Sequence, residues 1–526
     1  MDDVSISTNF PVIVNGAGPV GLTMACELAR HGIPLRIFDK NPEPATQSRA
    51  LAIFPRTLEA FHAMGIIDEV LAEGQRLEGI SMYNDSKRLA HLEFSSIESP
   101  YKFAIALPQS HTERILGARL ESLGVHVERS MELVSLDQDP ETVHPRYRAA
   151  DGTETAVAAP WILGCDGAHS AVRHLLGMTF QGAQYEEEFL LADVKVDSDL
   201  ATDQAHLFLS KDGLFAYFPF RGGRGRIIAD QRPGAQHPGP EPTFEEIVEI
   251  ARRRCPRPIA LSDPVWKAWF RISHRIVNTY SSGRAFLAGD SAHIHSPAGG
   301  QGMNTGIQDA FNLAWKVALV VRGLATPRLL GSYEAERMPV ARSVLNLTDR
   351  MTRAATAQLP GAQPLRDLLL PLVAGIPLVK EAMTERLAEV AIDYRGTPWV
   401  ENHGLGPVRA GDRAPDVVLF DRLDGVERRV FDLLQTPGFV LLVFEGLEEA
   451  PPGLGLLADL PGKTYRVRRP GCELKPGALE DRDCWAVKAY GAGEKGLLVL
   501  IRPDGYIGFR GESLADLRAY IDRLKS

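Results

Sequence analysis

The feature that most restricts the fold of this chain is a glycine-rich unit near its N-terminus, PVIVNGAGPVGLTMACELARHGIPLRIFDK. A short apolar strand leads into Gly16, Gly18 and Gly21, which have GxGxxG spacing. A helix with apolar residues at helical period follows, and then a second strand that ends at Asp39. Glycine turns also occur for purely structural reasons, but this one has the strand, the helix and the terminal acid. The unit predicts a Rossmann-like domain that binds a dinucleotide.

Each of these four residues has a physical role in such a unit. Gly16 allows a tight turn, and Gly18 lets backbone N–H groups approach a pyrophosphate at the positive end of the helix. Gly21 lets the helix pack closely on the strand. Asp39 would accept hydrogen bonds from a ribose of the adenosine half.

Two later segments repeat the pattern of a strand followed by a glycine-rich turn and a helix. They are PWILGCDGAHSAVRHLLG, residues 160–177, and FLAGDSAHIHSPAGGQGMNTGIQDAFNLAWK, residues 286–316. Three such turns could line one long groove at the carboxyl ends of parallel strands. A nucleotide larger than a nicotinamide cofactor would use all three.

Together the three motifs resemble the signature motifs of the FAD-dependent aromatic hydroxylases, the single-component flavoprotein monooxygenases with the para-hydroxybenzoate hydroxylase fold. The resemblance covers roughly the first 345 residues and includes SRALAIFPRTLEAF, LPQSHTERIL and LLGSYEAERMPVA. Within the family the sequence is most similar to the pentachlorophenol and phenol hydroxylase branch, which carries a thioredoxin-like C-terminal domain. The implied fold combines α/β and α+β parts: a Rossmann-like FAD-binding domain, an inserted β-sheet substrate domain, and the C-terminal domain.

The resemblance implies a role for several residues at the cofactor. Arg49 would lie near the pyrophosphate and the nicotinamide approach, although a surface salt bridge is an alternative for this residue. Gln109 would reach the ribityl chain, and Asp166 is similar to the aspartate that the family uses for both FAD and NAD(P)H. Asp290 would bind a ribityl hydroxyl. The remaining cofactor residues expected from the third motif are Gly300, Gly302, Met303 and Asn304.

The turn SPAGGQGMN explains the bare backbone of the third motif. It would lie flat against the isoalloxazine edge, where any side chain would collide with the ring, and this accounts for Gly299, Gly300 and Gly302. The helix that begins near 302–304 would direct its N-terminal N–H groups at the pyrimidine end of the flavin. That field stabilises negative charge and so favours the anionic reduced flavin.

Two histidines and a cysteine of these motifs invite other interpretations. His293 and His295 form an HxH pair that could place two imidazoles beside a metal ion. No third ligand cluster accompanies them and the family uses no metal, so we expect them to order the turn. Cys165, next to Asp166, is interpreted as a small core residue and not as a nucleophile.

Residues 181–280 change character and alternate like strands, with several aromatic residues. This segment is predicted to be the substrate domain. Along GLFAYFPF, one face carries Phe215 and Tyr217 and the other carries Leu214, Ala216 and Phe218. We expect the first face to line the substrate pocket, with plain sheet packing as the alternative.

Other pocket candidates are His206, Arg271 and Pro297. The phenol hydroxylase branch has an aspartate near the substrate, in the segment before RTLE, where this chain has Leu51. The departure puts simple phenol in doubt as the substrate. No catalytic residue, such as a general base for a phenol, is assigned by the sequence.

The predicted domains are a FAD-binding domain with a helical extension (1–180 and 281–403), the substrate domain (181–280) and a thioredoxin-like domain (410–526). In the last, GLLVLIRPDGYIGFR and a final helix predict a hairpin and a covering helix. The strand FVLLVF is followed by EGLEEAPPG, which lacks the redox dithiol. A role in packing or assembly is expected, and a homodimer is compatible with it.

Composition restricts the partners and the compartment. The net charge of −9 argues against a broad nucleic-acid or anionic-membrane surface, and no apolar run reaches the roughly 18 residues of a membrane span. The five scattered cysteines and the acidic start MDDVSISTNF favour the cytoplasm. A disulfide between Cys472 and Cys484 stays open as an alternative.

The sequence therefore predicts a FAD monooxygenase that uses NAD(P)H and O2 to hydroxylate a phenolic or related aromatic ring. The resemblance implies transfer of oxygen from a flavin C4a-hydroperoxide, with the protein supplying positioning and exclusion of water. Two alternatives stay open: epoxidation or Baeyer–Villiger oxygenation of a polyketide-like substrate on the same scaffold, and a flavin-loaded binding protein without turnover. Neither NADH nor NADPH is preferred by the sequence.

Overall fold

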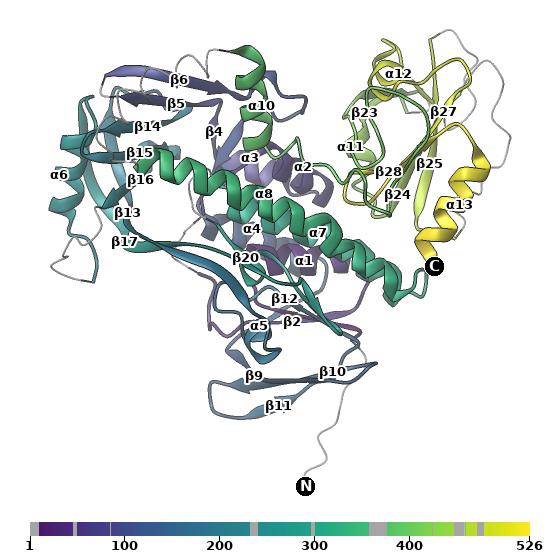
Figure 1. Cartoon of the computed structure of the whole chain (residues 1–526), viewed down its shortest axis with the longest axis horizontal. Coiled ribbons are helices and arrows are strands. Elements are labelled where there is room, and N and C mark those ends of the chain that lie inside the picture. The colour runs from purple at the N-terminus through teal and green to yellow at the C-terminus, as the bar shows by residue number, and fades with distance from the viewer. Residues whose placement is uncertain are drawn as a thin grey trace.

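The structure is a computed structural model (Figure 1). The large sheet with α6 (Phe244–Arg254) lies on one side, the C-terminal sheet on the other, and α7 (Gly302–Val321) and α8 (Gly331–Thr356) cross the centre between them. The residues that the structure describes are 10–45, 50–84, 86–231, 240–295, 300–356, 376–422, 424–445, 457, 459–470 and 478–526.

A six-stranded sheet with the order β18-β19-β12-β1-β2-β8 carries the glycine-rich motifs. Strands β1 and β2 pair in parallel, β1 also pairs in parallel with β12, and β12 with β19. Their short apolar sequences are almost entirely buried, as expected for parallel strands covered on both faces. The predicted strand–helix–strand unit is confirmed. The bounds are β1 Val12–Asn15, α1 Pro19–Arg30, β2 Leu35–Phe38, β8 Val127–Glu128, β12 Trp161–Gly164, β18 Ser281–Ser282 and β19 Ala285–Leu287.

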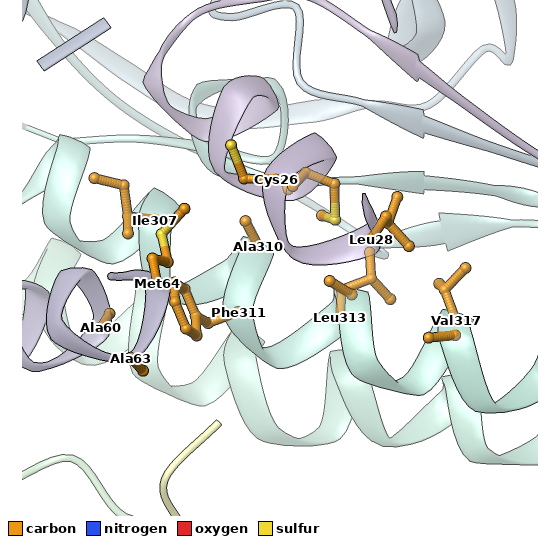
Figure 2. Close-up of a cluster of buried hydrophobic side chains, with 14 of the residues drawn as sticks. Cys26, Leu28, Ala60, Ala63, Met64, Ile307, Ala310, Phe311, Leu313 and Val317 are labelled. Atoms are coloured by element: carbon orange, nitrogen blue, oxygen red, sulfur yellow. The ribbon is translucent and has the colours of Figure 1, made fainter. Parts of the chain in front are cut away.

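Helix α7 is buried along nearly its whole length and contacts both α1 and α2 (Pro55–Met64). Figure 2 shows how this is achieved: Leu28 of α1 lies by Leu313 and Val317 of α7, while Met64 of α2 lies by Ile307. Small residues on the facing surfaces let the three helices approach closely. The start of α7 is thereby fixed relative to the sheet.

An eight-stranded sheet forms the second layer, with the order β20-β17-β13-β16-β15-β14-β5-β6. The predicted substrate segment supplies β13 to β17, but β5 and β6 come from before the second glycine motif, and β5 pairs in parallel with β14. The sheet therefore extends beyond 181–280. The bounds are β5 Gly79–Asn84, β6 Lys87–Glu93, β13 Phe180–Ser198, β14 Gln204–Ser210, β15 Gly213–Pro219, β16 Arg224–Gln231, β17 Ile259–Val277 and β20 His293–Ile294.

The C-terminal sheet has the order β21-β28-β27-β24-β25-β26-β22-β23. Strand β24 is fully buried and pairs in parallel with β25 and antiparallel with β27. The predicted hairpin of β27 and β28, followed by helix α13, is confirmed. The bounds are β21 Glu401–Asn402, β22 Val418–Asp421, β23 Val426–Arg429, α11 Val430–Leu433, β24 Phe439–Phe444, β25 Gly462–Arg468, β26 Ala478–Glu480, α12 Trp485–Tyr490, β27 Leu497–Ile501, β28 Ile507–Gly511 and α13 Leu514–Lys525.

Strand β21 pairs with β28 although its residues precede the predicted boundary of the C-terminal domain. Two small sheets complete the fold, β11-β10-β9 and β3-β7-β4. Among the described helices, none combines the length and the apolar character needed to cross a membrane. The remaining bounds are β3 Ala52–Ile53, α3 Ile67–Glu73, β4 Gln75–Leu77, β7 Ala104–Ala106, α4 Gln109–Ser122, β9 Met131–Gln138, β10 Val143–Ala149, β11 Glu154–Ala156, α5 Ala171–Leu175 and α10 Pro377–Leu387.

Candidate functional site

The three glycines of the first motif have distinct surroundings. Gly16 has φ +102°, and a Cβ there would lie 2.5 Å from the Cys165 carbonyl oxygen. A Cβ on Gly21 would lie 1.9 Å from the carbonyl oxygen of Gly16, so α1 packs directly on the turn. Around Gly18, by contrast, no described atom lies within 4 Å of a Cβ position. The N-terminus of α1 therefore faces open space through bare backbone, as a pyrophosphate requires.

Asp39 supports this turn from the end of β2. Its Oδ2 accepts a hydrogen bond from the Ala17 N–H at 2.6 Å, and its Oδ1 accepts one from the Asn41 N–H at 2.8 Å. A carboxylate has about four acceptor positions, so two are left for other donors. Asp39 can hold the turn and still accept from a ribose hydroxyl.

Asp166 connects all three motifs. Its Oδ2 accepts from the Asn15 amide at 2.9 Å and from the Ala171 N–H at 2.7 Å, at the start of α5. Its Oδ1 accepts from the Ser291 hydroxyl at 3.1 Å. Asn15 and Ser291 were not singled out from the sequence, because small polar residues in glycine turns give no pairing signal. Asp166 thus aligns the turns that follow β1, β12 and β19.

The third motif begins at the turn η3 (Gly289–Ser291). Gly289 has φ +60° and a Cβ there would contact Val20 at 2.8 Å, so this residue fits tightly against the first motif. Asp290 is exposed between its two buried neighbours. Asp290 follows β19, whose carboxyl end lies at the same edge of the parallel sheet as those of β12, β1 and β2.

The start of α7 is tied to the short strand β3. Asn304 is fully buried: its amide donates to the carbonyl oxygens of Ala52 at 2.8 Å and Gly300 at 2.9 Å, and its Oδ1 accepts from the Phe54 N–H at 2.9 Å. The side chain thus shapes the turn, leaving the backbone to face a ligand. Gly300 has φ +65°, and Gly302 has open space around its Cβ position.

The other predicted cofactor residues have mixed positions. Met303 is 8% exposed at the start of α7. Gln109 begins α4, accepts from the Ala50 N–H at 3.1 Å and donates to Glu113 at 2.8 Å. The predictions for Arg49, Pro297 and Gly299 lie outside the described residues. Gln109 therefore orders the segment that follows Arg49.

These features fit FAD. Bare backbone stands at Gly18 and Gly302 with open space in front, which is the cradle that a pyrophosphate and a flat ring need. Asp39 and Asp290 follow β2 and β19 and add two carboxylates at the carboxyl edge of the same sheet, which suits a ligand with several hydroxyls. Two helix N-termini, those of α1 and α7, supply the positive field for anionic groups.

The two faces of β15 have different neighbours. Phe215 and Tyr217 are buried in a cluster with Ile247 and Ile250 of α6, and burial raises the pKa of Tyr217 to about 12. Phe218 packs instead against a cluster that contains Leu51, Ala52 and Phe54, beside the turn at Gly300; the same cluster is contacted by Leu207 and Phe220. The alternation predicted for this strand is correct, but the structure places the opposite face toward the third motif.

His206 and Arg271 do not lie at that face either. His206 is 2% exposed, its Nε2 bonds the Ala201 carbonyl at 2.8 Å, and burial lowers its pKa. It stacks on Tyr83 and borders a cavity of 130 Å³ at the edge of the sheet. Arg271 is exposed and forms an ion pair with Glu188 at 3.3 Å. Both residues were pocket candidates from the sequence. In the structure they do not lie on the face of the sheet that carries Phe218.

A buried ion pair that sequence reasoning missed lies on the face with Phe218. Arg226 of β16 is fully buried and donates from Nε and Nη2 to both carboxylate oxygens of Asp193, on β13, at 2.8 Å each. Its Nη1 lies 3.4 Å from the Ala50 carbonyl oxygen, next to Arg49. Its guanidinium also lies 5.5 Å from the Trp266 ring centroid. The only signal in the sequence was a charged residue among buried positions of a strand.

A buried carboxyl group lies beside the first turns of α7. Glu389 accepts from the Thr305 hydroxyl at 3.0 Å and from the Gln308 amide, and it is 1% exposed. Burial outweighs these hydrogen bonds and raises the pKa of Glu389 to about 8. The folded state therefore holds this proton far more tightly than the unfolded chain.

This shift predicts a pH dependence of stability. The stability that the protonated Glu389 contributes is complete below the ordinary pKa of 4.5 and is lost as the pH rises toward about 8. Glu389→Gln carries no proton to lose, so its melting temperature relative to wild type should rise between about pH 5 and pH 8. Thermal melts of both proteins across this range measure it. Glu381→Gln, at an exposed position of α10, is the matched control. If the melting-temperature difference between Glu389→Gln and wild type changes with pH no more than that of the control, Glu389 is not a buried, protonated carboxyl group.

A parallel-strand dinucleotide site beside a second, mainly antiparallel sheet is the architecture of an FAD-binding hydroxylase fold. The family model described as FAD binding domain matches residues 9–348, and this chain belongs to that family. It is an FAD-dependent monooxygenase that hydroxylates aromatic rings, with NAD(P)H as co-substrate. The two alternatives, other oxygenations and a flavin-loaded binding protein, are not favoured.

Relatives along nearly the whole length support this assignment. The chain is 36% identical to the 6-methylpretetramide 4-monooxygenase of Streptomyces rimosus, over 95% of this chain and 90% of that protein. It is 32% identical to the pentachlorophenol 4-monooxygenase of Sphingobium chlorophenolicum, over 96% and 94%. The solved structure of the anhydrotetracycline hydroxylase OxyS from Streptomyces rimosus has a TM-score of 0.77 with 29% identity and covers 95% of each chain.

Proposed function

We propose that FAD is held by the three glycine motifs and that this chain's residues divide the work of binding it. Gly16, Gly18 and Gly21 bring the N-terminus of α1 to the pyrophosphate, and Asp39 accepts from the ribose. Asp290 accepts from the ribityl chain. When bound, FAD accepts reducing equivalents from NAD(P)H and activates O2 for transfer to the ring. Further members of the proposed site are Arg49, Gln109, Asp166, Gly300, Gly302, Met303 and Asn304.

Asp290 is the most direct test of this cofactor site. Asp290→Ala should weaken FAD binding by about 1.5 to 3 kcal/mol, because a charge-assisted hydrogen bond to a ribityl hydroxyl is lost. Titration of the FAD-free protein with FAD, followed by flavin fluorescence, measures the change. Asp522→Ala, at an exposed position of α13, should bind FAD like wild type. Equal affinities of all three proteins would remove Asp290 from the site.

We infer that the substrate is a multi-ring phenolic compound bound between the turn at Gly300 and the eight-stranded sheet. The observation that carries this proposal is the apolar cluster of Leu51, Ala52 and Phe54, against which Phe218 and other side chains of the sheet pack. Leu51 is where the phenol hydroxylase branch has an aspartate, so this wall favours a larger apolar ring system. Two of the relatives described above are named for tetracycline-type substrates.

Within this proposed site the chain's residues orient the ring and exclude water. The apolar side chains of the cluster pack on its faces, while the buried pair Arg226–Asp193 places a cation at the same wall without an open charge. The pair therefore holds β13 and β16 together behind this wall.

The two faces of β15 provide the experiment. Phe218→Ala should raise the KM for a stimulating aromatic substrate roughly three- to tenfold, through the loss of one ring contact. Its FAD content should not change. Tyr217→Phe alters the face under α6 and should leave KM unchanged, although the sequence analysis expected the face with Phe215 and Tyr217 to line the pocket. A panel of phenolic compounds, scored by stimulated NAD(P)H oxidation, supplies the substrate. A raised KM in Tyr217→Phe together with an unchanged KM in Phe218→Ala would instead support the face with Phe215 and Tyr217 as the lining of the pocket.

We propose that the C-terminal domain, 410–526, is thioredoxin-like and serves packing instead of redox exchange. Support comes from the order β25-β24-β27-β28, with β24 and β25 parallel, β27 and β28 antiparallel, and α13 at the end. Cys484 is partly buried, and Cys472 lies outside the described residues. The other proposed domains remain 1–180 with 281–403, and 181–280 extended by β5 and β6.

We also propose that the enzyme uses O2 as its oxidant and works in the cytoplasm as a homodimer. Buried cysteines at Cys26, Cys165 and Cys255 are compatible with a reducing compartment. Trp485 and Val426 are 68% and 47% exposed on the C-terminal domain and offer apolar surface for a second copy. Light scattering after size-exclusion chromatography measures the assembly state.

A further inference from the structure

A linear chain of three buried side chains lies inside the third motif. Asp309 of α7 bonds the Nε2 of His293 at 2.7 Å, and the Nδ1 of His293 bonds the Nε2 of His295 at 2.8 Å. Asp309 and His293 have no exposed surface, and His295 is 8% exposed. The Nδ1 of His295 is buried and makes no hydrogen bond to any described residue. One end of this hydrogen-bonded series is therefore the Asp309 carboxylate, and the other, open end is the Nδ1 of His295, which has no hydrogen-bond partner among the described residues.

The hydrogen-bond order fixes the protonation pattern. The Asp309 carboxylate accepts, so His293 carries a hydrogen on Nε2 and, when neutral, a lone pair on Nδ1. That lone pair accepts from the Nε2–H of His295, which leaves the Nδ1 of His295 as a free acceptor. When one proton enters at Nδ1 of His295, the single hydrogen bond between the two rings reverses its direction, while His293 Nε2 goes on donating to Asp309. The open nitrogen then presents an N–H.

The surroundings decide where the positive charge rests. Burial, and then the neighbouring His293, lower the pKa of His295 well below its ordinary value, so this ring stays neutral. His293 instead faces the carboxylate of Asp309. Burial alone would raise the pKa of Asp309, but Arg337 and His293 outweigh it and hold that pKa below its usual range. The carboxylate of Asp309 lies 2.7 Å from Nε2 of His293, so a positive charge on that ring would have a negative charge beside it.

Charged and titratable groups around the three side chains include Arg337, Glu334, which accepts from the Tyr280 N–H, and Glu389, whose pKa burial raises to about 8. Arg337 of α8 donates to Asp309 at 2.7 Å. While both imidazoles are neutral, the charges of Arg337 and Asp309 cancel and the four side chains together carry no net charge. Tyr280 stacks on His293 at 6.0 Å, and burial raises the pKa of Tyr280 and of Tyr333 well above the ordinary value. Burial likewise raises the pKa of the Cys165 thiol. Protonation of the chain therefore leaves a buried positive charge that needs a new negative charge nearby.

The open end belongs to the part of the third motif that is proposed to hold the flavin, between Asp290 and Gly300. The carboxylate end is tied to the other flavin segment, since Asp309 accepts the Gly289 N–H at 3.1 Å, next to Asp290. The chain thus connects the two segments of the third motif.

We propose that Asp309, His293 and His295 form a proton relay that takes up a proton from solvent when the bound flavin becomes negatively charged on reduction. The proton binds at Nδ1 of His295, the hydrogen on its Nε2 moves to Nδ1 of His293, and His293 becomes the cation beside Asp309. The reverse sequence returns a proton at Nδ1 of His295 once the negative charge is gone. His293 and Asp309 act as positioning residues. This inference rests on the proposed placement of FAD at the third motif.

Proton uptake on reduction tests the relay. Anaerobic enzyme is mixed with stoichiometric NAD(P)H in weak buffer with an indicator dye, and the bleaching of flavin absorbance reports reduction. His295→Gln keeps an N–H donor to His293 but cannot titrate, so it should take up about one proton fewer per flavin than wild type at neutral pH. His31→Gln makes the same change at another buried histidine, at the end of α1, and should match wild type.

A second measurement needs no variant. Hydrogen–deuterium exchange at the imidazole C2 position, followed by mass spectrometry, reports the pKa of each histidine in wild-type protein. The pKa of His293 should be higher in reduced than in oxidised enzyme. Equal proton uptake in all three proteins, or an unchanged His293 pKa in enzyme whose flavin is bleached, would overturn the relay. Wild-type protein that does not bind FAD at all would instead contradict the proposed cofactor site.

Discussion

Arg502→Met is expected to lower the free energy of unfolding by about 3 to 5 kcal/mol, because it breaks a buried ion pair and leaves its partners uncompensated. Arg502 follows β27 in the C-terminal domain and is 1% exposed. It donates to both carboxylate oxygens of Glu336, on α8, at 2.7 and 2.9 Å, and to Asp504 at 3.1 Å. The C-terminal domain therefore places a cation inside the central helices.

The carboxylates that pair with Arg502 also accept hydrogen bonds from α7, the helix that begins at Gly302. Lys316 of α7 donates to Glu336 at 2.8 Å, and burial lowers the pKa of Lys316 to about 8. Trp315, also of α7, donates to Asp504 at 3.2 Å. Loss of Arg502 would leave two buried carboxylates, Glu336 and Asp504, with Lys316 on Glu336, Trp315 on Asp504 and the Asn312 amide between them as the remaining partners.

Urea or guanidinium unfolding, followed by circular dichroism, measures this loss. Arg482→Met, which removes an exposed partner of Glu480 in the same domain, should cost less than about 1 kcal/mol. Similar small losses in both variants would show that the C-terminal domain is not fastened through the buried pair.

Gly21→Ala is expected to destabilise the protein by about 3 kcal/mol, the upper end of the range for overpacking. The added Cβ would lie 1.9 Å from the carbonyl oxygen of Gly16, so the backbone at Gly16 and the backbone at residue 21 must move apart. The shift opens the turn that is proposed to receive the pyrophosphate, so FAD affinity should fall as well. Thermal melts of the FAD-free and FAD-loaded forms should both show the loss.

Gly18→Ala is the matched variant of the same turn. Its φ of −75° suits alanine, and the Cβ would point into open space, so the FAD-free protein should keep its melting temperature. FAD affinity should still drop by about tenfold or more, equivalent to ~1.4 kcal/mol, because the Cβ occupies the approach to the helix N-terminus. A Gly18→Ala protein with wild-type FAD affinity would place the pyrophosphate elsewhere.

Local patterns predicted the parts of the fold whose causes are local. The strand, glycine turn and helix of the first motif follow from apolar period and from backbone freedom at Gly16, and the PDG turn at Gly505 predicted the last hairpin. The alternation along β15 was also visible. Which face packs under α6 was not visible, because the position of α6 on the sheet has no signature within β15.

Contacts between distant segments were beyond the sequence. Arg226 and Asp193 belong to strands whose pairing brings them together, and neither carries a motif. His293 and His295 were recognised as a pair. Their carboxylate partner Asp309 lies 16 residues after His293, on α7, so no local pattern connects them. Strand β21 joins the C-terminal sheet with only two residues, too few for a periodic signal.

Labelled oxygen tests the central claim most directly. The phenolic compound that most strongly stimulates NAD(P)H oxidation is incubated with the enzyme under ¹⁸O2, and the product is analysed by mass spectrometry. A hydroxylating monooxygenase should yield a product that carries about one labelled oxygen atom on its ring for each NAD(P)H consumed in coupled turnover. Stimulated NAD(P)H oxidation with all of the label in hydrogen peroxide, and none in an organic product, would contradict the account.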